Sequence, residues 1–395
     1  MLNRISKTIL LVIIIELCLG GGGRLTTIGP VSLRMVLFCI AIVLTTLLLL
    51  SGKSISTRYW KILAAFFLMN LVGVGLGWLN GSAKILIWED VKPLLYFLIL
   101  PFFALAIDES SPLNISKIIK VCALLTASLF FLLLILVHSG VFTFLSFYKA
   151  TEKTVEFFYR GEITFFYKGF LFLGIGSIFF FFSESNKKFL FVTVLVLAII
   201  FSVTRGLLFS LSCTLAAYFI GKKKYYHATS AAIFSLIIVV WGNTSTINFS
   251  RWIDANKGDK AYEEASPHLF GDRKYSDEGR FAQIKEVGER VSLTSIFVGH
   301  GFGQGIPARP IHMEIAYLEI FHKQGLIGLA FWGSLAWMLF TAYRDSNRSN
   351  FANAFFFSSL FVFVESATNQ YFNNPIGMSV LLLSLVSLYK LKNHL

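Results

Sequence analysis

The stretch IIKVCALLTASLFFLLLILVH, residues 118–138, decides the fold class, because its 21 residues include a single Lys or Arg and no acidic residue. A transmembrane helix needs about 20 mostly apolar residues, and this segment has that length. Comparable apolar segments recur near residues 8–23, 31–51, 60–79, 92–107, 164–183, 189–204, 206–221, 228–242, 324–343, 352–368 and 375–391. With a composition that is 55% hydrophobic and 14% charged, they predict an all-α polytopic membrane protein with about twelve transmembrane helices.

One polar stretch interrupts this pattern, at residues 243–312, between the ninth and tenth apolar segments. We expect it to form one large loop that continues into an amphipathic helix. The predicted organisation is a single integrated domain in three parts: N-terminal transmembrane helices in residues 1–242, the loop and its helix in residues 243–323, and C-terminal transmembrane helices in residues 324–395.

Basic residues fall in short clusters within alternate connections: Arg4/Lys7, Lys53/Arg58/Lys61, Lys117/Lys120, Lys187/Lys188, Lys222/Lys223/Lys224, Arg344/Arg348 and Lys390/Lys392. Cytoplasmic connections of membrane proteins carry an excess of Lys and Arg. This pattern predicts both termini in the cytoplasm and the large loop on the outer side of the membrane, which for a bacterial inner membrane is the periplasm. The net charge of +13 is attributed to contact with anionic membrane lipid, and no nucleic-acid partner is predicted.

Nucleotide and metal motifs such as GxxxxGK[ST] and HExxH do not occur in the sequence. The glycine-rich GHGFG, residues 299–303, leads from the polar loop toward a membrane segment and follows no Rossmann strand. The four cysteines lie in apolar runs without a CxxC pair, which predicts no disulfide framework and no cysteine-bound metal. Because ATP and nucleotide sugars are not ordinarily present outside the cytoplasm, a reaction there needs a substrate with its own leaving group, such as a lipid-linked diphosphate. We therefore predict no cofactor and no metal.

Four arginines in outward-facing segments are candidates for binding a diphosphate, because a guanidinium matches phosphate geometry and stays charged when partly desolvated. Arg205, in the sequence TRG, is a candidate because it interrupts an apolar run. The alternative is that its side chain extends to the lipid headgroups. Arg280 follows acidic residues and could form a solvated salt bridge. Arg160 lies among aromatic residues and could anchor the membrane interface. Arg309 is a candidate because it is close to His312 in sequence.

His312 is the candidate general base. Pro310 favours the first turn of a helix, which predicts a helix that begins there with His312 in its first turn. The field at that helix N-terminus would keep the imidazole neutral and able to take a proton from a sugar hydroxyl. Helical spacing would put Glu319 and Lys323 on the face of His312. The alternative is an ordinary histidine at the membrane interface.

Four features, in this order, resemble the O-antigen polymerase and O-antigen ligase superfamily: a TRG corner between two apolar segments, a long outward loop with an arginine, a GxGxG element, and a histidine that begins HxxxxYLxxxxxxGLIGL. The resemblance covers roughly residues 190–335. It implies action on undecaprenyl-diphosphate-linked glycans at the periplasmic face without metal or nucleotide. It also implies that Arg205, Arg280 and His312 are essential. Ligases usually follow the histidine with Asn or Ser, whereas this chain has Met313 and Glu314, which favours a polymerase.

We therefore predict a glycosyltransferase that joins lipid-linked repeat units. The growing glycan on undecaprenyl diphosphate is the donor, the terminal hydroxyl of a new unit is the acceptor, and the anomeric centre inverts. Glu314 is assigned with His312 to catalysis, and Glu319 and Tyr317 are assigned to orienting the substrate. The alternatives are an O-antigen ligase, which transfers the glycan to lipid A core, and a flippase or other transporter. The sequence leaves open whether a chain-length regulator is a partner.

Overall fold

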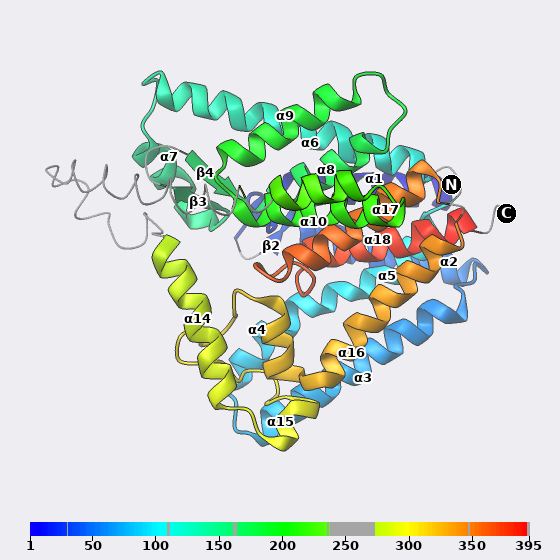
Figure 1. Cartoon of the computed structure of the whole chain (residues 1–395). Helices are drawn as coiled ribbons and strands as arrows, with labels where there is room; N and C mark the ends of the chain where they lie inside the picture. The colour runs from blue at the N-terminus through cyan, green and yellow to red at the C-terminus, as the bar shows by residue number, and fades with distance from the viewer. Residues whose placement is uncertain are drawn as a thin grey trace, which may run out of the picture. The chain divides into compact units, whose positions relative to one another are not determined.

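The computed structural model describes residues 1–29, 31–108, 111–160, 164–234, 237, 273–346 and 348–392. Over these residues the chain is mostly helical (Figure 1). Five helices are long and apolar enough to cross a membrane: α2 (Leu33–Leu50), α3 (Thr57–Leu79), α6 (Ser111–His138), α16 (Ala316–Arg344) and α18 (Pro375–Lys392). Shorter apolar helices include α8 (Leu171–Phe181), α9 (Lys188–Phe201), α10 (Arg205–Gly221) and α17 (Asn350–Glu365). A helical chain with several candidate spans is thereby confirmed, while the number twelve stays a prediction.

Residues 238–272 include the end of the predicted ninth segment and much of the predicted large loop, and they lie outside the described residues. The later part of that loop is helical, with α14 (Arg273–Glu289) and α15 (Leu293–Val298). The chain divides into two compact units. The first contains residues 1–13, 34–114 and 278–395, and the second contains residues 14–33 and 115–277. Helix α1 (Leu2–Leu19) begins in the first unit and ends in the second.

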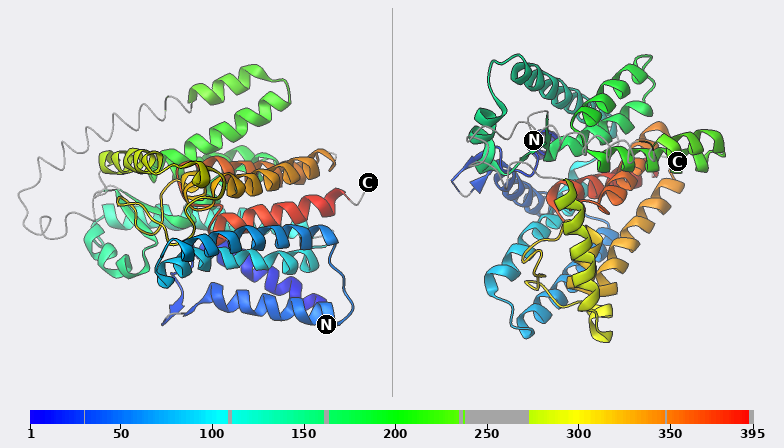
Figure 2. Two further views of the ribbon diagram at one scale, coloured as in Figure 1. Left: turned by 90° about the horizontal axis from the view of Figure 1, so that it is seen from below. Right: turned by 60° about the vertical axis from the view of Figure 1, so that its left-hand side comes forward.

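In the first unit, α3 and α18 each pack against α16, and the three helices run alongside one another (Figure 2). Aromatic side chains fill the contact between α3 and α16. Phe66 stacks on Phe97 with ring centroids 4.0 Å apart, and Trp332 meets both rings edge-on. Burial of these large rings is the main stabilising contribution that apolar side chains make to a helix contact. This packing fixes the helices whose ends carry the site described below.

The predicted span at residues 92–107 is not one regular helix. It is divided among α4 (Lys84–Leu94), a 3₁₀ helix η1 (Leu95–Ile99) and α5 (Leu100–Ala106). Pro93 lies inside α4 and Pro101 lies in the first turn of α5. Proline cannot donate a backbone hydrogen bond and its ring clashes with the preceding turn, so the α-helical ladder is interrupted here. Pro93 and Pro101 therefore account for the break in the predicted span.

The second unit adds α7 (Phe144–Thr151), the 3₁₀ helices η2 (Glu152–Thr154) and η3 (Lys168–Phe170), and two short antiparallel hairpins. One hairpin pairs β1 (Thr27–Ile28) with β2 (Val31–Ser32), and the other pairs β3 (Phe157–Arg160) with β4 (Thr164–Tyr167). Within the described residues, these short hairpins interrupt a chain that is otherwise mostly helical, as predicted. The segment predicted to span from residue 164 begins as β4, because aromatic residues at 157–159 pair across the hairpin with those at 165–167.

The GHGFG segment at residues 299–303 joins α3 to α16 through its backbone. Helix α16 is interrupted at Gly325, whose φ of 63° is left-handed, and this leaves carbonyls of the preceding turn without helical donors. The amide of His300 donates to the carbonyl of His322 at 2.8 Å, and that of Gly301 donates to the carbonyl of Lys323 at 3.0 Å. An interrupted helix at membrane depth needs such replacement partners. The motif therefore connects α3 and α16 through backbone hydrogen bonds. This role agrees with the expectation that it is not a nucleotide-binding loop.

On its other side the same segment lies directly against α3. The amide of Phe302 donates to the carbonyl of Gly73 at 2.9 Å. A Cβ atom at Gly77 would overlap the Phe302 carbonyl oxygen, whereas a Cβ atom at Gly75 would meet no atom within 4 Å. The backbones of α3 and the motif approach closely only because Gly77 lacks a side chain.

We predict that Gly77→Ala destabilises the protein by about 1–3 kcal/mol, the usual cost of forcing extra atoms into a packed contact. Gly75→Ala is the matched control on the same helix, and it should be neutral or slightly stabilising, because Ala is the better helix former. Thermal unfolding of both purified variants in detergent measures the difference. Equal unfolding temperatures for the two would show that the close approach contributes nothing.

Candidate active site

The segment before α16 differs from its prediction, because no helix begins at Pro310. Helix α16 begins at Ala316, and His312 lies in the irregular chain before it. Two contacts hold this chain away from helical geometry. Ile306 and Arg309 exchange backbone hydrogen bonds of 3.1 and 2.9 Å, and Met313 is buried in a small apolar cluster with Ile306. The prediction that the first turn of a helix holds His312 is wrong, so the helix field cannot be the reason for a neutral imidazole.

His312 instead faces two carboxylates. Its Nδ1 lies 3.3 Å from Oε1 of Glu319 and 3.6 Å from Oδ1 of Asp90. Since both neighbours are acceptors when ionised, the tautomer that fits carries its proton on Nδ1 and donates toward Glu319. The lone pair of a neutral ring then lies on Nε2, on the opposite edge. The side chain is 41% exposed, so Nε2 can reach a substrate.

Lys323 holds the two carboxylates in place. Its Nζ donates to Oδ1 of Asp90 at 2.7 Å, to Oε1 of Glu319 at 2.6 Å, and to the backbone carbonyl of Ile311 at 2.6 Å. An ammonium group has three protons, and each has an acceptor here. The Lys323 side chain is only 3% exposed. A buried charge is tolerated when it is paired and fully hydrogen-bonded, and Lys323 meets both conditions.

The remaining oxygens of the two carboxylates are also bonded. Oε2 of Glu319 accepts from the side-chain amides of Gln370 and Asn373, which follow α17. Oδ2 of Asp90 accepts from the Gly303 amide at 2.7 Å, which connects the site to the GHGFG segment. Complete hydrogen bonding fixes the orientation of both carboxylates, and through Glu319 it fixes the ring of His312.

Burial also affects the ionisation of Asp90, which lies in α4 outside the five candidate spans. Burial raises the pKa of the Asp90 carboxyl, and the Lys323 ammonium and the Gly303 amide oppose that rise. Burial likewise lowers the pKa of His300 in the GHGFG segment. Two carboxylates therefore share the Lys323 ammonium and face the His312 imidazole.

Asp90, His312 and Glu319 have ligand atoms within 4.8 Å of one another, a spacing that could hold a metal ion. The Lys323 ammonium, however, contacts Oδ1 of Asp90 and Oε1 of Glu319 directly. A divalent ion between these oxygens would have to displace a buried cation of the protein. The donor set therefore fits an ammonium better than a metal.

A second group of charges lies beside His312. Oε2 of Glu314 lies 3.2 Å from Nε of Arg280, and Oε1 of the same carboxylate is paired with Arg309. The amide of Glu314 donates to the side chain of Gln283 in α14 at 2.8 Å. Two guanidinium groups that converge on one partly exposed carboxylate mark a place where anionic oxygens are stabilised.

The structure brings together five of the predicted site residues in the first unit: Arg280, Arg309, His312, Glu314 and Glu319. Of the two predicted carboxylates, Glu319 contacts His312 and Glu314 contacts the arginines. The Tyr317 hydroxyl donates to the backbone carbonyl of Phe363 at 2.8 Å.

Two predicted arginines belong to the second unit. Arg205 is the first residue of α10, only four positions after the end of α9 at Phe201, which confirms the tight TRG corner. Arg160 is the last residue of β3. Their participation in the site stays a prediction.

Sequence reasoning missed Asp90, Gln283, Gln370 and Asn373, and it gave Lys323 no role. One signal was available for Asp90, because an acidic residue in the apolar stretch ILIWEDVKPL, residues 85–94, suggests a buried partner. The amides carried no comparable signal.

No family model matches the chain. A protein of Shigella flexneri named O-antigen polymerase is 29% identical over 405 aligned positions, which cover 99% of this chain and 97% of that protein. The match extends well beyond the motif region, across nearly every helix described above.

This match confirms the resemblance to the O-antigen polymerase and ligase superfamily. The name of the relative favours a likeness to the polymerases over a likeness to the ligases. The expected setting of a multi-pass membrane protein agrees with the candidate spans.

We predict that Lys323→Met destabilises the protein by about 3–5 kcal/mol, because it leaves two buried carboxylates without their cation. Asp90→Asn and Glu319→Gln added to Lys323→Met should restore part of that loss by removing both negative charges. Lys285→Met, which removes only an exposed ion pair with Glu289, is the control and should cost little. Unfolding in detergent measures all three, and an unchanged Lys323→Met variant would contradict the assigned role.

Proposed function

We propose that this protein is an O-antigen polymerase, which joins oligosaccharide repeat units carried on undecaprenyl diphosphate by glycosyl transfer. The observation that carries the proposal is His312, whose Nδ1 is held by Glu319 while its opposite nitrogen is available to a substrate. The nearly full-length relative named O-antigen polymerase supports the substrate class. A histidine oriented by a carboxylate is the usual arrangement of a general base.

In the proposed reaction Nε2 of His312 takes the proton of the acceptor hydroxyl. The freed oxygen attacks the anomeric carbon of the donor, and the bond from that carbon to the diphosphate breaks. The carbon inverts, and undecaprenyl diphosphate leaves with the bonding electron pair. Glu319 and Asp90 stabilise the imidazolium that forms, by their charge and their fixed positions. No metal or nucleotide takes part in these steps.

The leaving diphosphate needs positive charge at the same moment. Arg280 and Arg309 already converge on the Glu314 carboxylate, so a diphosphate oxygen can replace that carboxylate between them. Arg205, at the start of α10, is proposed as a further contact of the diphosphate. In this scheme Glu314 positions the arginines rather than transferring a proton.

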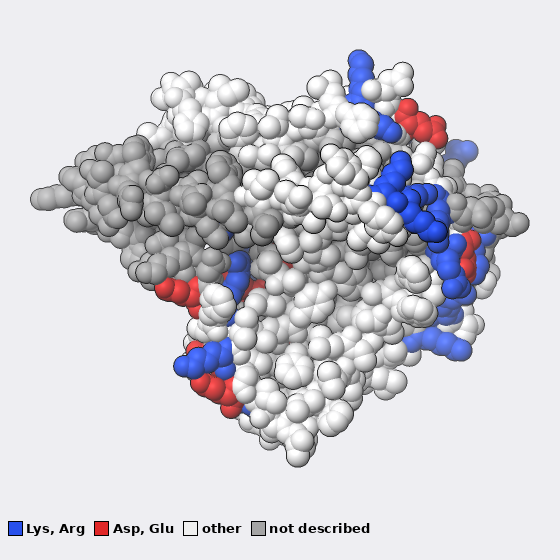
Figure 3. Space-filling view, in the orientation of Figure 1, with Lys and Arg blue, Asp and Glu red and all other residues white. Residues whose placement is uncertain are grey.

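The distribution of charge within the first unit supports a periplasmic site. Lys and Arg side chains gather where α16 and α18 end, while a mixed group of acidic and basic side chains lies along α14 (Figure 3). Lys392 bonds Asp345 at 2.7 Å, so the ends of α18 and α16 meet. Glu319 lies before the break at Gly325, and the regular part of α16 after that break, residues 326–344, is about 28 Å long at 1.5 Å per residue. The basic end is expected in the cytoplasm, which would place His312 at the opposite membrane face.

We expect His312→Ala to lower glycan polymerisation by at least about 100-fold, the usual contribution of a positioned general base. Arg205→Ala should have a comparable effect if this arginine binds the leaving diphosphate. The assay uses purified protein, a synthetic lipid-linked repeat unit and a chelator, and it measures new glycosidic bonds. His227→Ala, at an exposed histidine outside the proposed site, is the control. Chain ladders of normal length from both the His312 and the Arg205 variants would end this proposal.

Polymerase and ligase are separated by what a deletion strain makes. Loss of the polymerase should leave lipopolysaccharide with a single repeat unit, because ligation to lipid A core continues. Loss of a ligase should leave no repeat unit on the core. Gel analysis of lipopolysaccharide from the deletion strain, with the restored gene as control, distinguishes them. Absence of any repeat unit would favour the ligase, and formation of new bonds in the purified assay would exclude a flippase.

A further inference from the structure

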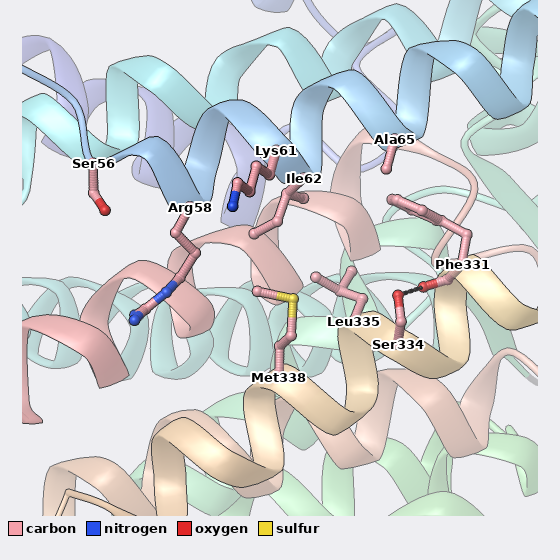
Figure 4. Close-up of a pocket in the computed structure, with 9 residues that line it drawn as sticks. All are labelled: Ser56, Arg58, Lys61, Ile62, Ala65, Phe331, Ser334, Leu335 and Met338. Atoms are coloured by element: carbon pink, nitrogen blue, oxygen red, sulfur yellow. Dashed lines mark hydrogen bonds between the residues drawn. The ribbon is translucent and has the colours of Figure 1, made fainter.

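A groove of about 590 Å³ lies between α3 and α16, near the basic end of the first unit. Its lining comes from two matching stripes, one on each helix (Figure 4). The α3 side is lined by Ser56, Arg58, Lys61, Ile62 and Ala65, and the α16 side by Phe331, Ser334, Leu335 and Met338. Spacings of three and four residues put each stripe on one helix face.

The lining changes from charged to apolar along α3. Arg58 and Lys61 lie in the first turns of the helix, and Ile62 and Ala65 follow toward its middle. The distance from Ser56 to Ala65 is about 14 Å at 1.5 Å per residue. Figure 4 shows the Arg58 and Lys61 side chains directed toward the space between the helices. This order matches a molecule with an anionic head and an apolar tail.

Among the described residues, no carboxylate balances the charge of these two cations, since none has an oxygen within ion-pair distance of Arg58 or Lys61. The guanidinium of Arg58 is stacked over the Tyr389 ring, with its central carbon 4.0 Å from the ring centroid. Stacking orients a guanidinium while leaving its edge free to donate hydrogen bonds. Arg58 is therefore preorganised to bind an anion.

We propose that this groove binds one anionic phospholipid of the surrounding leaflet. Arg58 and Lys61 would hold the phosphate, and an acyl chain would lie along Ile62, Ala65 and Phe331. Basic pockets between membrane helices are suited to anionic lipids, because attraction to the headgroup charge and burial of the acyl chain both favour binding. The groove lies along the C-terminal half of α16, whereas His312 precedes the N-terminus of that helix, so the lipid is a structural ligand and not a substrate. The proposal does not depend on the proposed function.

The test is native mass spectrometry of the purified full-length protein titrated with phosphatidylglycerol. We expect one saturable lipid, with binding weakened on the order of 10-fold in the double variant Arg58→Gln/Lys61→Gln. Ala65→Phe, which fills the apolar part without changing charge, should weaken binding as well. The control Arg348→Gln/Lys390→Gln removes two charges that do not line the groove, and it should keep the affinity.

Comparison ligands identify what the groove recognises. Phosphatidylcholine and inorganic phosphate should each bind much more weakly than phosphatidylglycerol, because one lacks net negative charge and the other lacks acyl chains. Equal binding of either compound would overturn the proposal. So would unchanged phosphatidylglycerol binding in both groove variants, or an equal loss in the control. Ala65→Phe keeps the test decisive if the charge variant does not fold.

Discussion

The site depends on one buried ammonium group. Lys323 satisfies its three protons with Asp90, Glu319 and the carbonyl of Ile311, which come from α4, from its own helix and from the irregular chain before it. Because an unpaired charge at this depth is costly, these three partners must assemble together or not at all. His312 has a defined orientation only as a result of that assembly, since its ring is held by the carboxylates that Lys323 fixes.

The GHGFG segment connects this charge cluster to the membrane helices. It compensates the break of α16 at Gly325, packs on α3 at Gly77, and donates to Asp90 through Gly303. Glycine is required where the backbones approach this closely, so close packing accounts for the glycines of the motif. A pattern that looks like a phosphate loop is here the element that holds an acid and a lysine at a fixed distance.

The sequence predicted the long apolar helices well, because hydropathy over twenty residues is a local property. Residues 375–391, for example, were predicted as a span and form α18. Predictions from neighbouring residues were wrong where a contact distant in the sequence determines the backbone conformation. The chain after Pro310 does not become helical, since burial of Met313 and the bond from Lys323 hold it in an irregular form. Asp90 precedes Lys323 by 233 positions, and no spacing rule could pair them.

One of the three acceptors of Lys323 is the main-chain oxygen of Ile311. The contact therefore depends on the backbone conformation at position 311 and not on the type of side chain there. The Ile311 side chain is 41% exposed and contributes nothing to the ammonium contact that its carbonyl makes. Many residue types can therefore occupy this position without loss of the bond, provided that the peptide keeps its direction. A substitution at position 311, next to the proposed base, can therefore change the local surface while the charged framework beneath it stays constant.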